Sequence, residues 1–388
     1  MQMRPNLLNP ASASSPRALV VGGSLAGLFA ATTLRAAGWD VAVFERSPQA
    51  LESRGGGLVL QPDVLEAFRF AGIDLDPLLG VASDDRIYLD ADDRVISRTF
   101  MPQTQTSWNK LYSTMLDALP DHTVHSGERL VSFQQSGDKV MALFASGRIE
   151  SGDILIGADG AMSSVRTQLL PPSRPAYAGY VAWRGLVAEP MLGANAADRL
   201  GSAFAFQQGR DHLFLEYRIP GADGSTEAGR RRWNWVWFRK VPEGTALTRL
   251  LTDRHGAAHT FSLPPGEVDV ARVRELRQAA LECLAPSFSA LVLATEEPFL
   301  QAIIDLTVPR MVSGRVVLIG DAAFVPRPHT AGGAAKAAND ARTLAQALRG
   351  GVRDLPDRLA QWETGQLAAG NAMCAWGVSV GNRIMGIA

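Results

Sequence analysis

The residues most able to do chemistry in this sequence are glycines and carboxylates that follow short apolar runs. The segment Gly22–Gly27 comes directly after the apolar run Ala18–Val21, and Glu45 closes a second apolar run 23 positions after Gly22. A glycine turn that opens a helix presents backbone N–H groups to a pyrophosphate, and an acid at this spacing can accept hydrogen bonds from ribose hydroxyls. This order predicts a dinucleotide-binding unit, whose cofactor contacts are Gly22, Ser24, Gly27, Glu45 and Arg46.

Two further carboxylate–glycine pairs stand at the ends of apolar runs. Asp159-Gly160 is the first pair and Gly320-Asp321 is the second. A carboxylate at the C-terminal end of a parallel strand can hold the hydroxyl groups of a cofactor. We therefore expect both pairs to contribute to the cofactor site.

A proline-rich loop and a second helix start follow Asp321. The loop contains Pro328 and His329, and Gly332-Gly333 then opens an alanine-rich helix. Glycine permits close approach of a backbone, and a helix N-terminus favours negative charge. The pattern predicts that Pro328, Gly332 and Gly333 lie against an anionic part of the cofactor.

Two histidines are candidate catalytic bases, because histidine titrates in the range useful for removing a proton from a ring hydroxyl. His329 stands in the proline-rich loop, and His212 begins a predicted strand. An alternative stays open for each. His329 could be purely structural in its proline-flanked loop, and His212 could be an exposed histidine at a strand end.

Tryptophan at every second position of Trp233–Trp237 places three indoles on one face of a strand. That face is either core or the wall of an aromatic pocket. Alternation alone does not decide which face of a strand meets the cofactor. The candidate substrate-binding residues on the predicted strands are Trp183, Arg184, Tyr217, Trp235 and Trp237.

Composition excludes several classes of partner. The chain has 388 residues, with 38 Lys+Arg against 39 Asp+Glu and a net charge of -1. This balance supplies no field for a nucleic acid or an anionic membrane, so Arg230–Arg232 beside the tryptophans does not predict a nucleic-acid surface. The uncharged run Ala18–Leu34 is short for a membrane span and contains Gly22 and Gly23, which favours a strand, a turn and a helix.

The cysteines and the N-terminal segment carry little chemistry. Cys283 and Cys374 match no metal-ligand spacing, so we expect reduced, buried thiols and no metal site. Met1–Arg17 contains no apolar run followed by a cleavage site, and it is predicted to be a short disordered leader.

The order of the elements predicts two domains in an α/β fold. Antiparallel-looking strands cover Tyr177–Lys240, a helical pattern covers Val268–Leu284, and a buried strand returns at Val316–Ile319. A strand that late implies a discontinuous first domain. We expect a Rossmann-like cofactor domain at 15–80, 101–175 and 296–388, with an inserted, mostly antiparallel β-sheet substrate domain at 81–100 and 176–295.

Together, the three motifs resemble those of the single-component flavoprotein aromatic hydroxylases, the para-hydroxybenzoate hydroxylase-like family. The phrases Tyr177–Gly185 and Gln361–Thr364 strengthen the resemblance, and flavin-dependent urate hydroxylases share part of the first. The resemblance implies that Gly22, Gly27 and Glu45 bind the adenosine diphosphate part of FAD. It also implies that Asp159 and Gly160 serve flavin and nicotinamide, that Gly320 and Asp321 hold the ribityl chain, and that Pro328 lies beside the flavin ring.

The resemblance also implies an activity. The expected enzyme is a monooxygenase that uses FAD, NAD(P)H (NADH slightly favoured) and dioxygen to hydroxylate a hydroxylated aromatic or N-heteroaromatic ring, such as a hydroxypyridine, through a flavin hydroperoxide. A cytoplasmic protein is expected, with a homodimer as the one assembly considered and the oligomeric state left open. The alternatives are a flavin reductase or oxidase of the same fold, a urate-type hydroxylase, and a FAD-binding sensor without turnover.

Some residues depart from the family pattern. Trp108 stands where many members have an arginine that contacts the FAD phosphates. Ala331-Gly332-Gly333 and Ala335 replace the usual Gly-Gln-Gly and the asparagine that follows it. Backbone contacts to the flavin ring survive these changes, but the side-chain contacts do not.

Overall fold

The computed structural model describes residues 15–49, 51, 56–74 and 79–387. Most of the predicted N-terminal leader, residues 1–14, lies outside the described residues, and so does the start of the glycine cluster near residue 55. Within the described range the chain forms two large sheets and a three-stranded sheet.

A six-stranded, mainly parallel sheet forms the first layer, in the order β17-β18-β10-β1-β2-β6. Its central strand β1 is parallel to both β10 and β2. β10 is buried throughout, and β1 and β2 are buried apart from their first residues, as the apolar runs predicted. The strands are β1 (Arg17–Val21), β2 (Asp40–Glu45), β6 (Val124–Ser126), β10 (Ile154–Gly157), β17 (Val312–Ser313) and β18 (Val316–Leu318).

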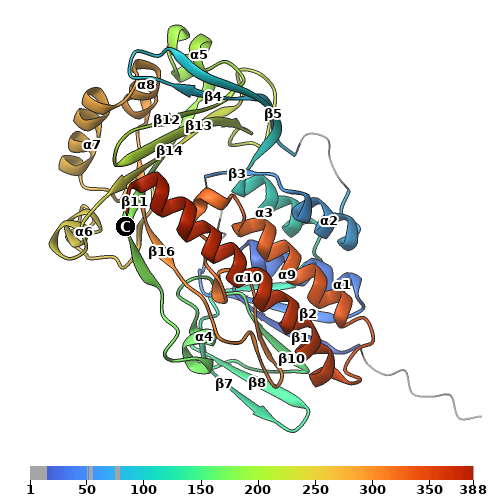
Figure 1. The fold of residues 1–388 in the computed structure, drawn as a ribbon. Helices are drawn as coiled ribbons and strands as arrows, with labels where there is room; N and C mark the ends of the chain where they lie inside the picture. The colour runs from blue at the N-terminus through green and yellow to red at the C-terminus, as the bar shows by residue number, and fades with distance from the viewer. Residues whose placement is uncertain (1–14, 50, 52–55, 75–78, 388) are drawn as a thin grey trace, which may run out of the picture.

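Helices pack against this sheet and against each other. The apolar faces of α1 and α9 meet, and α10 runs past them toward the other sheet (Figure 1). The helices are α1 (Leu25–Ala36), α2 (Pro62–Ala71), α3 (Trp108–Asp117), α4 (Ser164–Leu169), α9 (Gly333–Ala347) and α10 (Leu355–Met385). The strands β7 (Leu130–Ser136), β8 (Lys139–Phe144) and β9 (Ile149–Gly152) form the small sheet. No helix in the described ranges is long and apolar enough to cross a membrane.

A nine-stranded sheet forms the second unit, in the order β15-β16-β11-β14-β13-β12-β4-β5-β3. Every neighbouring pair is antiparallel except β4 and β12, which confirms the mostly antiparallel prediction. The strands are β3 (Gly57–Val59), β4 (Val81–Leu89), β5 (Val95–Ser107), β11 (Ala176–Ala188), β12 (Phe204–Gln208), β13 (His212–Ile219), β14 (Arg232–Lys240), β15 (Ser262–Leu263) and β16 (Phe299–Asp305).

Two stretches that the predicted bounds assign to the cofactor domain belong to the other sheet. Gly57–Val59 and Phe299–Asp305 fall in the predicted cofactor domain, yet they are strands of the nine-stranded sheet. The exact domain bounds therefore stay a prediction.

The two faces of the nine-stranded sheet have different neighbours. We call the face that packs on α7 and α8 the outer face; Trp233, Trp235 and Trp237 belong to this core. We call the opposite face the inner face; it carries Tyr180, Phe238 and Tyr217 and meets Met385 of α10. The remaining helices are α5 (Ala194–Leu200), α6 (Thr245–Leu250), α7 (Val270–Cys283) and α8 (Pro286–Ala294), with short 3₁₀ turns η1 (Glu189–Met191), η2 (Gly320–Ala322) and η3 (Pro328–Thr330).

The cysteines are unpaired, but one prediction about them is wrong. Cys374 is buried, whereas Cys283 is exposed at the end of α7, on the solvent side of that amphipathic helix. Among the described residues, no cluster of His, Cys, Asp or Glu is arranged to hold a metal ion.

One carboxylate is enclosed in the outer-face core. Glu216 on β13 is 0% exposed, and neither of its carboxylate oxygens accepts a hydrogen bond with good geometry from the described residues. Burial raises its pKa well above the ordinary 4.5, against the opposing effects of Arg218 and the Ala205 amide. Glu216 is therefore a buried acid that favours its neutral form.

We expect Glu216→Gln to remove a loss of stability that accompanies rising pH. A raised folded-state pKa means that the folded protein keeps this proton longer than the unfolded chain, so stability falls as pH rises above about 4.5 through the raised value. Urea unfolding of the holoprotein between pH 5 and 8 should show a shallower decline in the free energy of unfolding for Glu216→Gln. The exposed Glu243 offers a matched control, Glu243→Gln. Equal declines in all three proteins would contradict the expectation.

Candidate functional site: the carboxyl edge of the parallel sheet

The turn after β1 packs tightly against the end of β10. Gly22 has φ +106, and a Cβ there would lie 2.5 Å from the carbonyl oxygen of Ala158. A Cβ on Gly27 would overlap the carbonyl oxygen of Gly22. Only glycine fits these two positions, so the first and second motifs are in direct contact.

The N-terminus of α1 opens at this turn without a side-chain cap. Ser24 has extended backbone angles, and its side chain makes no capping hydrogen bond. The first N–H groups of a helix have no partner inside the helix. They are therefore able to bind a phosphate, as the glycine pattern predicted.

Glu45 closes β2 beside the same turn. Its Oε2 accepts a hydrogen bond from the Gly23 N–H at 2.8 Å, and its Oε1 accepts one from the Ser47 N–H at 2.8 Å. The neighbouring Arg46 is exposed. The carboxylate thus holds the glycine turn in place, and each oxygen keeps lone pairs for a ribose hydroxyl.

Asp159 is engaged within its own segment. It accepts hydrogen bonds from the Ser163 hydroxyl, from the Ser164 N–H at 2.6 Å and from the Val165 N–H at 3.2 Å. Burial raises the pKa of Asp159, while these donors act in the opposite direction. The side chain therefore fixes the start of α4. Its predicted contact with flavin and nicotinamide stays a prediction, as does that of Gly160.

The Gly320-Asp321 turn joins the first motif from the other side. Gly320 has φ +56, and a Cβ there would lie 2.8 Å from the Cβ of Ala26 on α1. Its N–H donates to Asp340 at 2.9 Å, and Lys336 donates to the same carboxylate. This buried pair on α9 fixes the turn.

Asp321 itself is exposed, yet protein surrounds it. Burial raises its pKa, Asp340 adds to that rise, and Lys336 acts against it. Asp321 follows the C-terminal end of β18 and is accessible at this edge of the parallel sheet. This placement fits the predicted bond to the hydroxyl chain of a cofactor.

The loop after Asp321 ends at the start of α9. Ala331 has φ +50, a left-handed conformation that is unusual for a residue with a Cβ. The helix that follows has Gly332 at its N-cap with no side-chain cap, and a Cβ on Gly333 would meet nothing within 4 Å. The departures from the family pattern therefore leave open backbone N–H groups where an anionic group would bind.

His329 lies in the same loop, enclosed by the inner face of the nine-stranded sheet. Its Nε2 is 3.0 Å from the hydroxyl of Tyr180, and its ring centroid is 4.4 Å from that of Phe238. Burial, together with the charge of Arg327, lowers the pKa of His329 to about 4. His329 is therefore neutral at physiological pH and a weak base.

The structure corrects four of the residues predicted from the sequence. Trp183, Trp235 and Trp237 belong to the outer-face core, where the Trp235 indole N–H donates to Thr295 at 2.8 Å. His212 contacts Trp237 on that face, with Trp237 Nε1 donating to its Nδ1 at 3.2 Å. Because side chains alternate along a strand, these four point away from the cofactor motifs.

Arg184 and Tyr217 lie on the inner face, as required of substrate-binding residues. Arg184 has no ion pair or hydrogen bond with any described residue, and its Nε is buried. Burial raises the pKa of Tyr217 to about 12, although the Arg184 charge opposes the rise. Close by, the Oδ1 of the fully buried Asn234 accepts a hydrogen bond from the Gly57 N–H at 2.7 Å.

Sequence reasoning missed Tyr180 and Asn234. Both could have been found by alternation once Arg184 and Tyr217 were placed. Tyr180 stands four positions before Arg184 on β11, and Asn234 is the register partner of Tyr217 across β13 and β14. Trp108 stands in place of the arginine. Its ring stacks on that of Tyr112, with centroids 4.8 Å apart, and its backbone N–H donates to the Gly56 carbonyl.

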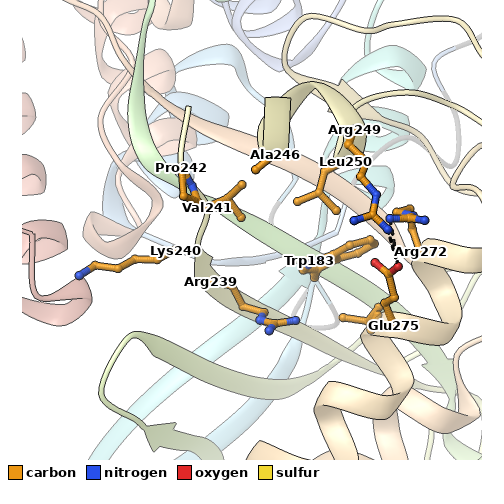
Figure 2. Close-up of a pocket in the computed structure, with 11 residues that line it drawn as sticks. Trp183, Arg239, Lys240, Val241, Pro242, Ala246, Arg249, Leu250, Arg272 and Glu275 are labelled. Atoms are coloured by element: carbon orange, nitrogen blue, oxygen red, sulfur yellow. Dashed lines mark hydrogen bonds and ion pairs between the residues drawn. The ribbon is translucent and has the colours of Figure 1, made fainter. Parts of the chain in front are cut away.

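A separate pocket of about 260 Å³ lies on the outer face, away from these motifs (Figure 2). Trp183 forms part of its wall, and Arg249 and Arg272 both pair with Glu275, at 2.7 Å and 3.0 Å. Four cationic side chains and one carboxylate line the pocket, so its wall keeps an excess of positive charge. The cofactor motifs, not this pocket, define the chemical site.

Known proteins resemble this chain closely in sequence. The family described as FAD binding domain-like matches residues 177–305. The 2,6-dihydroxypyridine 3-monooxygenase of Paenarthrobacter nicotinovorans is 38% identical over 365 residues, which is 93% of this chain and 89% of that protein. The 6-hydroxynicotinate 3-monooxygenase of Pseudomonas fluorescens is 28% identical over 349 residues, covering 86% and 83% of the two chains.

Solved structures agree with the sequence comparison. The structure of 2,6-dihydroxypyridine-3-hydroxylase from Arthrobacter nicotinovorans has a TM-score of 0.90 and 36% identity, over 96% of this chain and 94% of that one. Klebsiella pneumoniae HpxO, complexed with FAD and uric acid, shares the fold with a TM-score of 0.78 at 23% identity, over 96% and 89% of the two chains. A relative this similar over most of both chains shows the family: this chain is one of the FAD-dependent monooxygenases that hydroxylate aromatic rings with NAD(P)H as co-substrate.

Proposed function

We propose that the substrate is a hydroxylated N-heteroaromatic ring of the hydroxypyridine class, and that Arg184 anchors it. The observation that carries this proposal is the guanidinium of Arg184 on the inner face, beside Tyr217 and Asn234, which has no partner among the described residues. A half-buried cation without a counter-charge among those residues is costly, and a ligand oxygen that bears negative charge removes the cost. The named activities of the two monooxygenase relatives support the same class.

The residues that would hold FAD fit the cofactor. We propose that Gly22, Ser24 and Gly27 bind the pyrophosphate, that Glu45 binds the ribose, and that Asp321 binds the ribityl chain. Arg46 stays a predicted contact. When bound, FAD accepts hydride from NAD(P)H and activates dioxygen for transfer of one oxygen atom to the ring. Preference for NADH, a cytoplasmic location and a homodimer stay predictions.

The side chains around the ring have separate tasks in this proposal. Arg184 and Tyr217 bind and orient the oxygen substituents of the substrate. The apolar side chains of the inner face, Val236 and Phe238 among them, exclude water. Pro328 and His329 approach from the loop before α9. A dry site of this kind favours oxygen transfer over release of hydrogen peroxide.

Arg184→Met should raise KM for a hydroxypyridine by roughly 10- to 100-fold, because a hydrogen bond to a charged group contributes about 1.5–3 kcal/mol. FAD content should not change. The matched control is Arg239→Met, since Arg239 is also half-buried but lies on the outer face, 4.6 Å from the Trp237 ring. Stimulated NADH oxidation and oxygenated product should be measured over a panel of hydroxypyridines, purines and benzoates. Equal KM in both variants, or turnover of purines alone, would contradict the proposal.

Asp321→Ala should lower FAD affinity about tenfold, because the variant loses hydrogen bonds to the hydroxyl chain. The ratio of flavin to protein absorbance after dialysis measures the loss. Asp138→Ala, at an exposed hairpin position, is the control. A fully yellow Asp321→Ala protein would remove Asp321 from the cofactor site.

His329→Ala should keep FAD but consume more NADH per product, releasing hydrogen peroxide, because its removal opens the ring site. Peroxide and product should be measured together in one assay. His212→Ala is the control, because His212 lies on the outer face. If coupling and pH dependence stay unchanged in His329→Ala, His329 has no part in the reaction.

A further inference from the structure

A row of polar groups leads from β16 to His329. Arg327 is 4% exposed, and two of its nitrogens donate to Asp305, at 2.8 Å and 2.6 Å. A third nitrogen donates to the Oδ1 of Asn382 on α10 at 2.8 Å. Three hydrogen bonds from one planar group fix the position of the guanidinium.

Tyr180 lies between Arg327 and His329. It is 0% exposed, its ring centroid is 5.5 Å from the Arg327 guanidinium carbon, and its hydroxyl is 3.0 Å from His329 Nε2. Gly381 of α10 covers the pair so closely that a Cβ there would be 2.7 Å from the Tyr180 hydroxyl and 2.9 Å from an Arg327 nitrogen. The hydroxyl is therefore enclosed on the α10 side.

The chemistry of the neighbours decides which group donates. A guanidinium can only donate, so Arg327 offers the Tyr180 hydroxyl no acceptor, and the hydroxyl hydrogen is left for His329. Burial raises the pKa of Tyr180 to about 12, so the phenol keeps its proton. The pKa of His329, about 4, keeps the imidazole neutral.

Among the residues that the structure describes, no other charge near His329 reverses this preference. Arg327 is the cation on its own loop, and Asp305 is already paired to that cation. Strand β14 contributes Phe238, and α10 contributes the uncharged Asn382. The His329 ring thus accepts at Nε2 and carries its single proton on Nδ1.

We propose that Tyr180 is a positioning residue that holds His329 in the neutral Nδ1–H tautomer, so that His329 donates a hydrogen bond to a substrate oxygen and does not act as a base. The hydrogen bond from His329 to the substrate rests on the proposed function, which places a hydroxypyridine beside Pro328. In this site Arg184 and His329 both stabilise negative charge on the ring oxygens. His329, a candidate base from the sequence, is therefore a hydrogen-bond donor to the substrate in this proposal.

The test is Tyr180→Phe, which removes the hydroxyl and keeps the ring. Tyr177→Phe is the matched control, because the Tyr177 hydroxyl on the same strand donates to the Val241 carbonyl at 2.9 Å and does not contact His329. Nitrogen NMR of the ¹⁵N-histidine-labelled holoenzyme reports the tautomer directly, and His329→Ala assigns the signal. The pH profile of kcat/KM for a hydroxypyridine reports the consequence.

We expect the wild type and Tyr177→Phe to show protonated Nδ1 and unprotonated Nε2 at pH 7. Tyr180→Phe should show a mixture of tautomers, an acidic limb shifted to higher pH, and kcat/KM lower by about three- to tenfold. Protonated Nε2 in the wild type, or a tautomer and pH profile unaffected by Tyr180→Phe, would overturn the assignment. If the expected tautomer occurs but no hydroxypyridine is turned over, the tautomer assignment stands and the proposed substrate fails.

Discussion

The close backbone contact at the carboxyl edge of the parallel sheet is the constraint on which the site depends. Gly22 meets Ala158, and Gly320 meets Ala26, each at a distance that leaves no room for a side chain. These two contacts bring three distant segments of the chain to one edge. The first turn of α1 lies at these contacts, and a Cβ on Gly320 would also lie 3.5 Å from the Cβ of Ala337 near the start of α9, so the open N-termini of both helices are close to this edge.

Positive backbone angles and buried charges at this edge support one another. Gly320 adopts φ +56, and its N–H is held by Asp340, whose charge is balanced by Lys336. A buried carboxylate without a counter-charge would cost several kcal/mol, so Asp340 needs Lys336 beside it to stay charged while buried. By holding the Gly320 N–H, Asp340 and Lys336 fix the direction of the chain just before Asp321, the proposed cofactor-binding residue.

Sequence reasoning reached the strands and the cofactor motifs because both depend on local patterns. The predicted strand Arg232–Arg239 differs by one residue from β14, and His212–Ile219 coincides with β13. Which face of those strands meets the cofactor depends on contacts with α7, α8 and α10, which lie far away in sequence. For that reason alternation alone leaves Trp235 and Trp237 as candidates for either a pocket wall or the core, and the structure places them in the outer core. The prediction that Cys283 is buried is wrong for the same reason.

The two faces of one sheet therefore divide the work between neighbouring residues. On β11, Trp183 stabilises the outer core, while Arg184, the next residue, lies on the inner face with no partner among the described residues. A near-zero net charge, -1 over the whole chain, gives the enzyme no general attraction for an anionic substrate. Recognition must then come from local groups that protein shields from water, where one charge has a larger effect than at the surface. We propose that Arg184 on the sheet and the neutral His329 on the loop that precedes α9 are such groups.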